Sequence, residues 1–460
     1  MLARGLRRAA ASAASTAANR PVTYGPTTLT GDRSEDPVTA GESFGRAVQA
    51  QIYRAGLFGR TPRVPVSPDA LEAAARRRMS RTAWAYVAGS AGRERTAHAN
   101  RSALDRWEIV PRMLRDVEDR DTGVELFGAR LPSPFLFAPV GVLEMAHQEA
   151  DLAVAAAARE LGVPMVISTQ GSVPMEETAV ALAETVRWYQ LYWPGDDGLA
   201  ASLVRRAEAT GAAAIVVTLD TDLLGWRTRD LDLAWLPFGR AMGIAQYLSD
   251  PVFAELVAER ASRPRQDAPV KPGLAALKTL AGIARRYPGG FLRNLTSPLP
   301  RAAVETFLDV FSRPALTWEH LAWLRERTSL PIVLKGLQHP DDAALALDHG
   351  VDGIIVSNHG GRQVDGAIGA IDALPGIAER VGGRIPVLFD SGIRSGADAF
   401  KALALGARAV LVGRPYVYGL ALAGADGARE VVRNLMAEFD LTMALTGRTT
   451  TSDITRDALR

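Results

Sequence analysis

The chain has 460 residues, of which 47% are hydrophobic and 23% are charged, so it is long enough for one large domain with additions or for two or three small ones. Its formal net charge is only +2, which gives no sign of the basic surface that binds nucleic acid, and it has no cysteine, which excludes disulfides, thiolate metal ligands, iron–sulfur clusters and a cysteine nucleophile. No apolar run approaches the ~20 residues that cross a bilayer, so we expect no membrane partner. From the low net charge and the absence of cysteine we expect no nucleic-acid partner and no metal site.

Residues 1–40 differ in composition from the rest of the chain. Residues 1–20 are rich in Ala, Arg and Ser and contain no acidic side chain, as organelle transit peptides do, but they lack the long apolar core of a secretory signal. We expect a disordered extension over residues 1–40 and one folded domain over residues 41–460, in the cytoplasm. A targeting segment and a start codon assigned too early are the alternatives for the extension.

From residue 135 onward, eight short apolar runs alternate with Ala-rich stretches whose apolar residues have helical spacing. The expected strands are residues 135–138, 165–168, 187–190, 214–217, 332–335, 353–356, 387–390 and 409–412, and the helical stretches include residues 150–161, 199–210, 340–349 and 397–406. Strands that alternate with helices imply a parallel sheet, and eight such units imply a closed (β/α)8 barrel, the TIM barrel of the α/β class. We expect an N-terminal helical extension before the barrel and a long insertion after its fourth strand. An open doubly wound sheet is the alternative, but no Gly-x-Gly-x-x-Gly turn follows any of the strands.

Polar or charged side chains stand at the C-terminal end of nearly every expected strand. In a barrel these ends share one face, and barrel enzymes carry their chemistry there. In chain order the residues are Pro139, Val140 and Gly141, Ser168, Gln190 and Tyr192, Thr218 and Asp220, Lys335, Ser357, His359 and Arg362, Asp390 and Arg394, and Gly413 and Arg414. Because such a series is hard to assign to stability, the sequence predicts an active site at this face.

The run Ser-Asn-His-Gly-Gly-Arg-Gln over residues 357–363 is the most informative of these ends. It follows an apolar run, so it is typical of a functional loop after a buried strand. The imidazole of His359 can take a proton near neutral pH, and the guanidinium of Arg362 can hold a carboxylate by two parallel hydrogen bonds. The pair predicts a substrate with an acidic proton beside a carboxylate.

The loops after the last two expected strands, residues 390–396 and 413–415, each combine glycine with an arginine. Glycine exposes backbone N–H groups to an anion, and the loops after strands seven and eight of a barrel are a frequent phosphate site. The sequence therefore predicts a cofactor that bears a phosphate.

Residues 357–363 also resemble the signature of the FMN-dependent L-2-hydroxy acid dehydrogenases and oxidases. The resemblance runs from about Tyr86 to the C-terminus and is nearest to the lactate 2-monooxygenase type. The segments shared with that type are Tyr-Val-Ala-Gly at 86–89, Gly-Trp-Arg at 225–227, Asp-Pro-Val-Phe at 250–253, Lys-Gly-Leu-Gln-His-Pro-Asp-Asp at 335–342 and Leu-Phe-Asp-Ser-Gly-Ile-Arg at 388–394. The resemblance implies FMN as the cofactor and oxidation of an L-2-hydroxy acid, with L-lactate expected, to the 2-keto acid.

The same resemblance implies a role for each matching residue. For the flavin ring, the residues are Pro139, Val140, Gly141, Ser168, Gln190 and Thr218, with Lys335 by its N1–C2 edge. For the ribityl chain and phosphate they are Asp390, Arg394, Gly413 and Arg414, with Ser357, Ser391 and Gly392 as further cofactor-binding residues. Tyr86, Arg227 and Arg362 bind the substrate carboxylate, and Tyr192 faces the substrate hydroxyl or the product keto group. The catalytic residues are His359 as the base, Asp220 as the group that orients it, Tyr192 and Lys335.

The sequence leaves the electron acceptor open between O2, a quinone and a cytochrome. Gly141 matches the monooxygenase type, where several oxidases have Ala, and favours O2 with coupled oxidative decarboxylation of the keto acid. An insertion over about residues 236–314, which we interpret as a lid or a subunit contact, has a basic, amphipathic segment at residues 271–286. A quinone- or cytochrome-linked L-lactate or mandelate dehydrogenase is therefore the alternative. Gln170, where many oxidases carry an aromatic residue, leaves the substrate preference open, and the family implies a homotetramer or homo-octamer.

Overall fold

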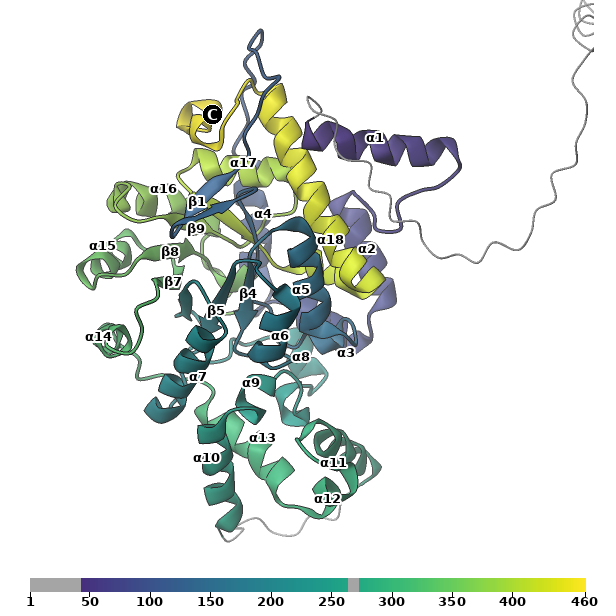
Figure 1. The fold of residues 1–460 in the computed structure, drawn as a ribbon, viewed down its shortest axis with the longest axis vertical. Helices are drawn as coiled ribbons and strands as arrows, with labels where there is room; N and C mark the ends of the chain where they lie inside the picture. The colour runs from purple at the N-terminus through teal and green to yellow at the C-terminus, as the bar shows by residue number, and fades with distance from the viewer. Residues whose placement is uncertain (1–42, 264–272) are drawn as a thin grey trace, which may run out of the picture. The chain divides into compact units, whose positions relative to one another are not determined.

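The structure is a computed structural model that describes residues 43–263 and 273–460. At its centre is a closed barrel of eight parallel strands, in which each strand pairs with the next along the chain and the last pairs with the first (Figure 1). The strands are β3 (Phe135–Phe137), β4 (Met165–Ser168), β5 (Arg187–Leu191), β6 (Ile215–Thr218), β7 (Ile332–Leu337), β8 (Gly353–Val356), β9 (Val387–Phe389) and β10 (Ala409–Val412). The predicted barrel is confirmed. The extension predicted for residues 1–40 lies outside the described residues.

The strand side chains are buried on both faces, as parallel strands covered by helices require. The interior of the barrel is filled by the middle residues of the strands, among them Leu136, Trp188 and Ile355. A two-stranded hairpin, β1 (Val124–Leu126) and β2 (Ala129–Leu131), adds to this interior cluster, and the ring of Phe127 at its turn lies 5.4 Å from that of Trp188. The hairpin was not predicted from the sequence.

The helices between the strands begin and end at the residues that favour helix termini. The helices of this outer ring are α5 (Ala150–Leu161), α6 (Met175–Leu182), α7 (Asp197–Ala209), α14 (His320–Arg325), α15 (Pro340–Asp348), α16 (Ala370–Val381), α17 (Gly396–Ala404) and α18 (Arg414–Leu445). Asp196 caps α7, and Ser395 with Asp398 forms a capping box at α17. Gly162 and Gly382 end α5 and α16 with a positive φ that glycine adopts without strain.

Four helices precede the barrel and confirm the predicted N-terminal helical extension. They are α1 (Phe44–Leu57), α2 (Pro68–Arg78), α3 (Arg81–Ala88) and α4 (Arg95–Asp105). The helices α1 and α2 pack against α18. Helix α3 carries Tyr86, which lines the cavity at the C-terminal ends of the strands.

The segment between β6 and β7 is helical and contains the predicted insertion. Its elements are α8 (Thr228–Asp232), η2 (Phe238–Arg240), α9 (Ala245–Leu248), α10 (Pro251–Ser262), α11 (Leu274–Arg286), α12 (Phe291–Thr296) and α13 (Leu299–Val310). Figure 1 shows α10 to α13 as a group of helices beyond the barrel, at the lower end of the view. Aromatic contacts hold the group together: the rings of Tyr247 and Phe307 meet edge to face at 4.8 Å, and Phe238 lies 5.2 Å from Phe307.

A buried ion pair fixes the first helix to the last. Asp440 on α18 accepts hydrogen bonds from Arg120 Nε at 2.9 Å and Nη2 at 3.1 Å, and its other contact is the backbone N–H of Gly45 in α1 at 2.8 Å. The side chains of Arg120 and Asp440 are only 7% and 4% exposed.

We expect Asp440→Asn to lower the free energy of unfolding by about 3 kcal/mol, because it leaves the buried Arg120 charge without its partner. Urea unfolding of the two proteins measures the difference. Arg460→Gln is the matched control, since it removes an exposed ion pair with Glu108 and is expected to leave the free energy of unfolding nearly unchanged. Equal losses in the two variants would contradict the assignment.

Candidate active site

A cavity opens at the C-terminal ends of the strands, where the sequence predicts the active site. It holds about 1050 Å³ of empty space, counting the part that is open to solvent. Its lining includes sixteen of the predicted site residues: Tyr86, Pro139, Val140, Gly141, Tyr192, Thr218, Arg227, Lys335, His359, Arg362, Asp390, Ser391, Gly392, Arg394, Gly413 and Arg414. The strand ends therefore bring together residues from Tyr86 to Arg414 in one cleft, of the size that holds a cofactor with a small substrate.

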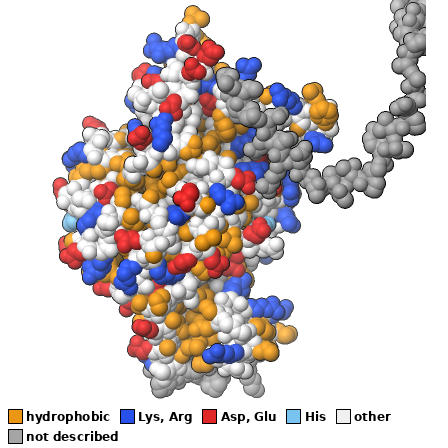
Figure 2. All heavy atoms as spheres, in the orientation of Figure 1, with side chains coloured by type: hydrophobic (Ala, Val, Ile, Leu, Met, Phe, Trp, Pro, Cys, Tyr) orange, Lys and Arg blue, Asp and Glu red, His pale blue; other side chains and the backbone are white. Residues whose placement is uncertain are grey.

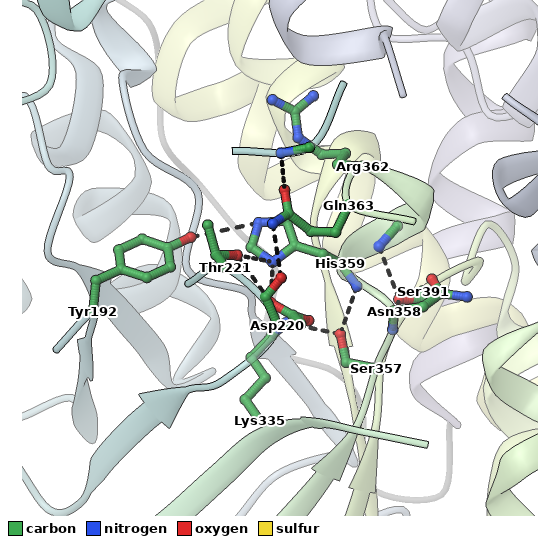
Figure 3. Close-up of polar contacts among 12 residues, drawn as sticks. Tyr192, Asp220, Thr221, Lys335, Ser357, Asn358, His359, Arg362, Gln363 and Ser391 are labelled. Carbon is green, nitrogen blue, oxygen red and sulfur yellow. Dashed lines mark hydrogen bonds and ion pairs between the residues drawn. The ribbon is translucent and has the colours of Figure 1, made fainter. Parts of the chain in front are cut away.

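His359 lies in η3 (His359–Gly361), the turn that follows β8, and its ring is held by three side chains. Figure 3 shows Asp220, Thr221 and Tyr192 converging on the imidazole. Asp220 Oδ1 lies 2.7 Å from Nδ1, Thr221 Oγ1 lies 3.2 Å from Nδ1, and the Tyr192 hydroxyl lies 3.4 Å from Nε2. Because a carboxylate only accepts hydrogen bonds, Nδ1 carries the proton and Nε2 keeps its lone pair.

Burial and the surrounding charges favour a neutral imidazole at His359 beside an ionised carboxylate at Asp220. Burial disfavours the imidazolium and lowers the pKa of His359, and the Asp220 charge opposes this effect. Burial alone would raise the pKa of Asp220, but the charges of His359 and Lys335 hold it at about 2. Burial, helped by the Asp220 charge, raises the pKa of Tyr192 to about 12, so the phenol stays protonated. At neutral pH the site therefore holds a base with a hydroxyl donor next to it.

Two arginines face the cavity without a carboxylate partner. Within the described residues, neither Arg227 nor Arg362 forms an ion pair, and both donate hydrogen bonds to neutral acceptors. Arg227 donates to the side-chain oxygen of Gln363 at 2.9 Å, and Arg362 donates to the Gly89 carbonyl at 2.9 Å. Burial, with the like charge of Arg362, lowers the pKa of Arg227 to about 10, so the guanidinium is still charged at neutral pH. A buried cation, Arg227, and a half-buried one, Arg362, without a counter-ion form a binding site for an anion, and a carboxylate fits their geometry.

Lys335, at the end of β7, is a buried cation on the other side of His359. Its Nζ donates to Ser357 Oγ at 2.9 Å and lies 3.0 Å from Asp390 Oδ2. Burial alone would lower the pKa of Lys335, but the charges of Asp390 and Asp220 raise it above its ordinary value. The ammonium is therefore permanently charged and can stabilise negative charge that develops nearby.

The far end of the cavity has the features of a phosphate site. Arg394 and Arg414 both line it, and within the described residues neither forms an ion pair. Burial lowers the pKa of both guanidiniums, for Arg414 to about 10. Gly392 has a φ of 121°, which turns the backbone of the loop in a way that glycine alone adopts without strain.

Four predicted site residues lie behind the cavity wall and do not line it: Ser168, Gln190, Asp220 and Ser357. Asp220 and Ser357 act on lining residues, because they contact His359 and Lys335. Gln190 Oε1 accepts a hydrogen bond from Ser168 Oγ at 3.3 Å, whereas Gln190 Nε2 is buried and has no partner among the described residues.

The sequence analysis missed Thr221, which contacts both Asp220 and His359. Its position directly after Asp220 at a strand end was the available signal. Several further lining residues had no role predicted from the sequence: Val87, Ala138, Leu224, Gly360, Ile393, Leu411 and Val417. Among the described residues, no group of three or more His, Cys, Asp or Glu side chains is placed to hold a metal ion.

Comparisons with known proteins agree with this geometry. A family model described as FMN-dependent dehydrogenase matches residues 75–460. An FMN-dependent alpha-hydroxy acid dehydrogenase from Penicillium citrinum is 41% identical over 419 residues, which are 91% of this chain and 96% of that protein. An L-lactate oxidase from Lysinibacillus sphaericus is 42% identical over 385 residues, which are 84% of this chain and 90% of that protein.

A solved structure of a mandelate oxidase with (S)-4-hydroxymandelic acid is 38% identical to this chain and has a TM-score of 0.70. The match covers 86% of this chain and 98% of the mandelate oxidase chain. The matched regions contain the barrel and every residue of the cavity described above. The cofactor is FMN, and the chain belongs to the FMN-dependent dehydrogenase family, whose similar members oxidise 2-hydroxy acids.

Proposed function

We propose that this protein oxidises L-lactate with O2 and couples the oxidation to decarboxylation, as a lactate 2-monooxygenase does. The more general activity, FMN-dependent oxidation of a 2-hydroxy acid, follows from membership of the FMN-dependent dehydrogenase family. The observation that carries the proposal is the placement of the His359–Asp220 pair in the same cavity as Arg227 and Arg362. A 2-hydroxy acid supplies a carboxylate for the arginines and, on the adjacent carbon, a proton for the imidazole.

The residues present fit FMN. Thr218 lines the cavity, and its Oγ1 is a buried polar atom without a partner among the described residues, as expected where a polar heterocycle completes its hydrogen bonds. Lys335 is a permanent cation for the electron-rich edge of that ring, and Arg394 and Arg414 are unpaired cations for a phosphate. The chemistry that FMN would supply when bound there is uptake of the two electrons that leave the hydroxy acid.

The side chains of this protein orient the substrate and move its proton. Arg227 and Arg362, with Tyr86 beside them, hold the carboxylate, and the Tyr192 hydroxyl bonds the substrate oxygen on C2. Nε2 of His359 then accepts a proton, either from C2 or from the hydroxyl group, and Asp220 stabilises the imidazolium that results. The two routes stay open, because Nε2 faces the place of both protons.

Retention of the keto acid is what separates a monooxygenase from an oxidase. With retention, one L-lactate and one O2 give acetate, CO2 and water; with early release they give pyruvate and hydrogen peroxide. Gly141 supports retention, since a methyl group there would lie 2.8 Å from Gln170 Cβ and 3.0 Å from the Gln170 carbonyl oxygen. The glycine lets Gln170 close the wall of the cavity that an alanine would push back.

A quinone-linked dehydrogenase at a membrane surface is the second candidate, because α11 and α12 expose an apolar ridge. Leu274 and Leu292 are 79% and 78% exposed, and Leu277, Leu280 and Leu295 are exposed beside them. Residues 273–296 contain four cations and no acidic side chain, and Figure 2 shows basic and hydrophobic side chains together at this end of the molecule. Such a surface suits an anionic bilayer. In the described parts of the chain, no helix has the length and apolarity to cross a membrane.

The family resemblance also leads us to propose a cytoplasmic homotetramer or homo-octamer.

We expect the purified yellow protein to be bleached by L-lactate without air and, in air, to give acetate and CO2 in equal amounts with little peroxide. Gly141→Ala is expected to raise the share of pyruvate and peroxide at least about tenfold, because retention depends on a difference of one methyl group in a packed wall. Product analysis by NMR with a peroxide assay measures both. Stoichiometric peroxide from the unmodified protein would refute the decarboxylation.

We expect kcat/KM for L-lactate to fall as the pH drops through the lowered pKa of His359, because the imidazolium cannot accept a proton. Asp220→Asn removes the charge that raises this pKa, so the acidic limb of the profile should move to lower pH and kcat should fall by about 10²- to 10⁴-fold. Thr221→Val is the control, since it keeps the charge and should leave the limb in place. A limb that moves to higher pH in Asp220→Asn would contradict the assigned roles.

The two candidates differ in acceptor and location. We expect the bleached protein to be reoxidised faster by air than by a soluble quinone, and to stay in solution when vesicles of phosphatidylcholine and phosphatidylserine are sedimented. Sedimentation with these vesicles, lost in a Leu274→Asp and Leu292→Asp double variant, together with faster reoxidation by quinone, would favour the membrane-linked dehydrogenase.

A further inference from the structure

Glu144 connects the insertion to the active-site loop at two separate points. It lies in η1 (Leu143–Met145), which follows Gly141 almost directly. Its Oε1 accepts a hydrogen bond from the backbone N–H of Gly243, in the turn before α9, at 3.2 Å. Its Oε2 accepts from Arg286 Nε at 2.9 Å and lies 2.8 Å from Nη2, at the end of α11. One carboxylate therefore holds both the first part of the insertion and its exposed helix.

The contact at Gly243 reaches the wall of the substrate cavity. Gly243 has a φ of 66°, and a Cβ there would lie 2.5 Å from Val142 Cγ2 and 3.0 Å from the Gln170 carbonyl oxygen. That same carbonyl accepts the N–H of Val142 at 2.9 Å, and Gln170 packs on Gly141. The backbone of the insertion at Gly243 therefore packs against Val142 and Gln170 so closely that no side chain fits between them.

Helix α11 packs against η2, α12 and α13, and Arg286 adds a charged attachment at its end. Of the residues that the structure describes in α11, only Ile283 and Ala284 are buried, and Arg286 alone forms an ion pair. The side chains of Arg286 and Glu144 are 35% and 21% exposed. Half-exposed ion pairs contribute little to global stability and are weakened by salt, so the loss of this pair loosens the helix and leaves the barrel folded.

We propose that the Glu144–Arg286 pair is a latch that couples the insertion to the Gly141–Gln170 wall, with Glu144 as a positioning residue for substrate binding and product retention. The inference rests on the proposed function, which makes retention of the keto acid the step that the wall controls. When the latch is broken, the packing of Gly243 against Gln170 becomes looser, and the substrate and keto acid leave the cavity more easily. The proton transfer at His359 is unaffected, because the contacts of that ring lie elsewhere.

Arg286→Glu and Glu144→Gln break the latch by repulsion and by loss of charge, and Glu144→Gln keeps an acceptor for the Gly243 N–H. We expect each to raise the L-lactate concentration for half-maximal anaerobic bleaching by about threefold, with the limiting rate unchanged, and to raise the ratio of pyruvate to acetate. Chymotrypsin should cleave faster after Phe291, the first residue of α12, in both variants. Arg286→Lys should restore most of each property.

Arg285→Glu is the matched control, since it makes the same change in net charge one residue away, and Arg285 contacts the Phe291 ring and not Glu144. If Arg286→Glu and Glu144→Gln behave like Arg285→Glu in bleaching and cleavage, the latch is refuted. The bleaching and cleavage measurements do not involve acetate. A protein that forms no acetate would therefore refute the decarboxylation while these two readouts still decide whether the latch exists.

Discussion

The structure depends on a collection of positive charge that the barrel itself leaves unpaired. Arg227, Arg362, Arg394 and Arg414 line one cavity, and among the described residues none of the four forms an ion pair. Placing buried cations near one another is unfavourable, and the lowered pKa values of Arg227 and Arg414 express that cost. The scaffold tolerates it because eight strand ends and α3 fix the side chains in place. Anions at two ends of the cavity, a carboxylate and a phosphate, would offset this cost, so the site is arranged for binding.

Among the described residues, Asp390 is the carboxylate that lines the cavity and Asp220 lies behind its wall, and each has a separate partner. Asp390 neutralises Lys335, and Asp220 orients His359 from behind the cavity wall. The division matters because a carboxylate that faced Arg227 or Arg362 would compete with the substrate. It also keeps Nε2 of His359 free, with only the Tyr192 hydroxyl beside it at 3.4 Å. This distance is long for a hydrogen bond of the resting site and suits a contact that tightens when substrate enters.

The sequence was sufficient for the barrel, because most of its strands are short apolar runs between helices with clear ends. The run at residues 353–356 is a strand with those same bounds. Periodicity also placed most site residues at one face, since parallel strand ends meet there by topology. It could not distinguish a residue that lines the cavity from one behind it, so Ser168 and Gln190 were expected beside Gly141 and lie in the wall. The hairpin at Phe127 and the contacts of Thr221 and Asp440 depend on side chains distant in sequence, which periodicity does not report.

The catalytic groups alone leave the choice of substrate and the fate of the product undetermined. In the proposed function, Arg227, Arg362, Tyr192 and His359 act on the carboxylate, the hydroxyl and the proton on C2, which all 2-hydroxy acids that can be oxidised to 2-keto acids share. Substrates differ in the group attached to C2, and products differ in the time for which they stay bound. The surfaces that can control these two properties are the Gly141–Gln170 wall and the insertion. These two surfaces are in contact through Val142 and Gly243, so a change in either is transmitted to the other. Selectivity and retention are therefore one packing problem, set by residues that take no part in the proton transfer.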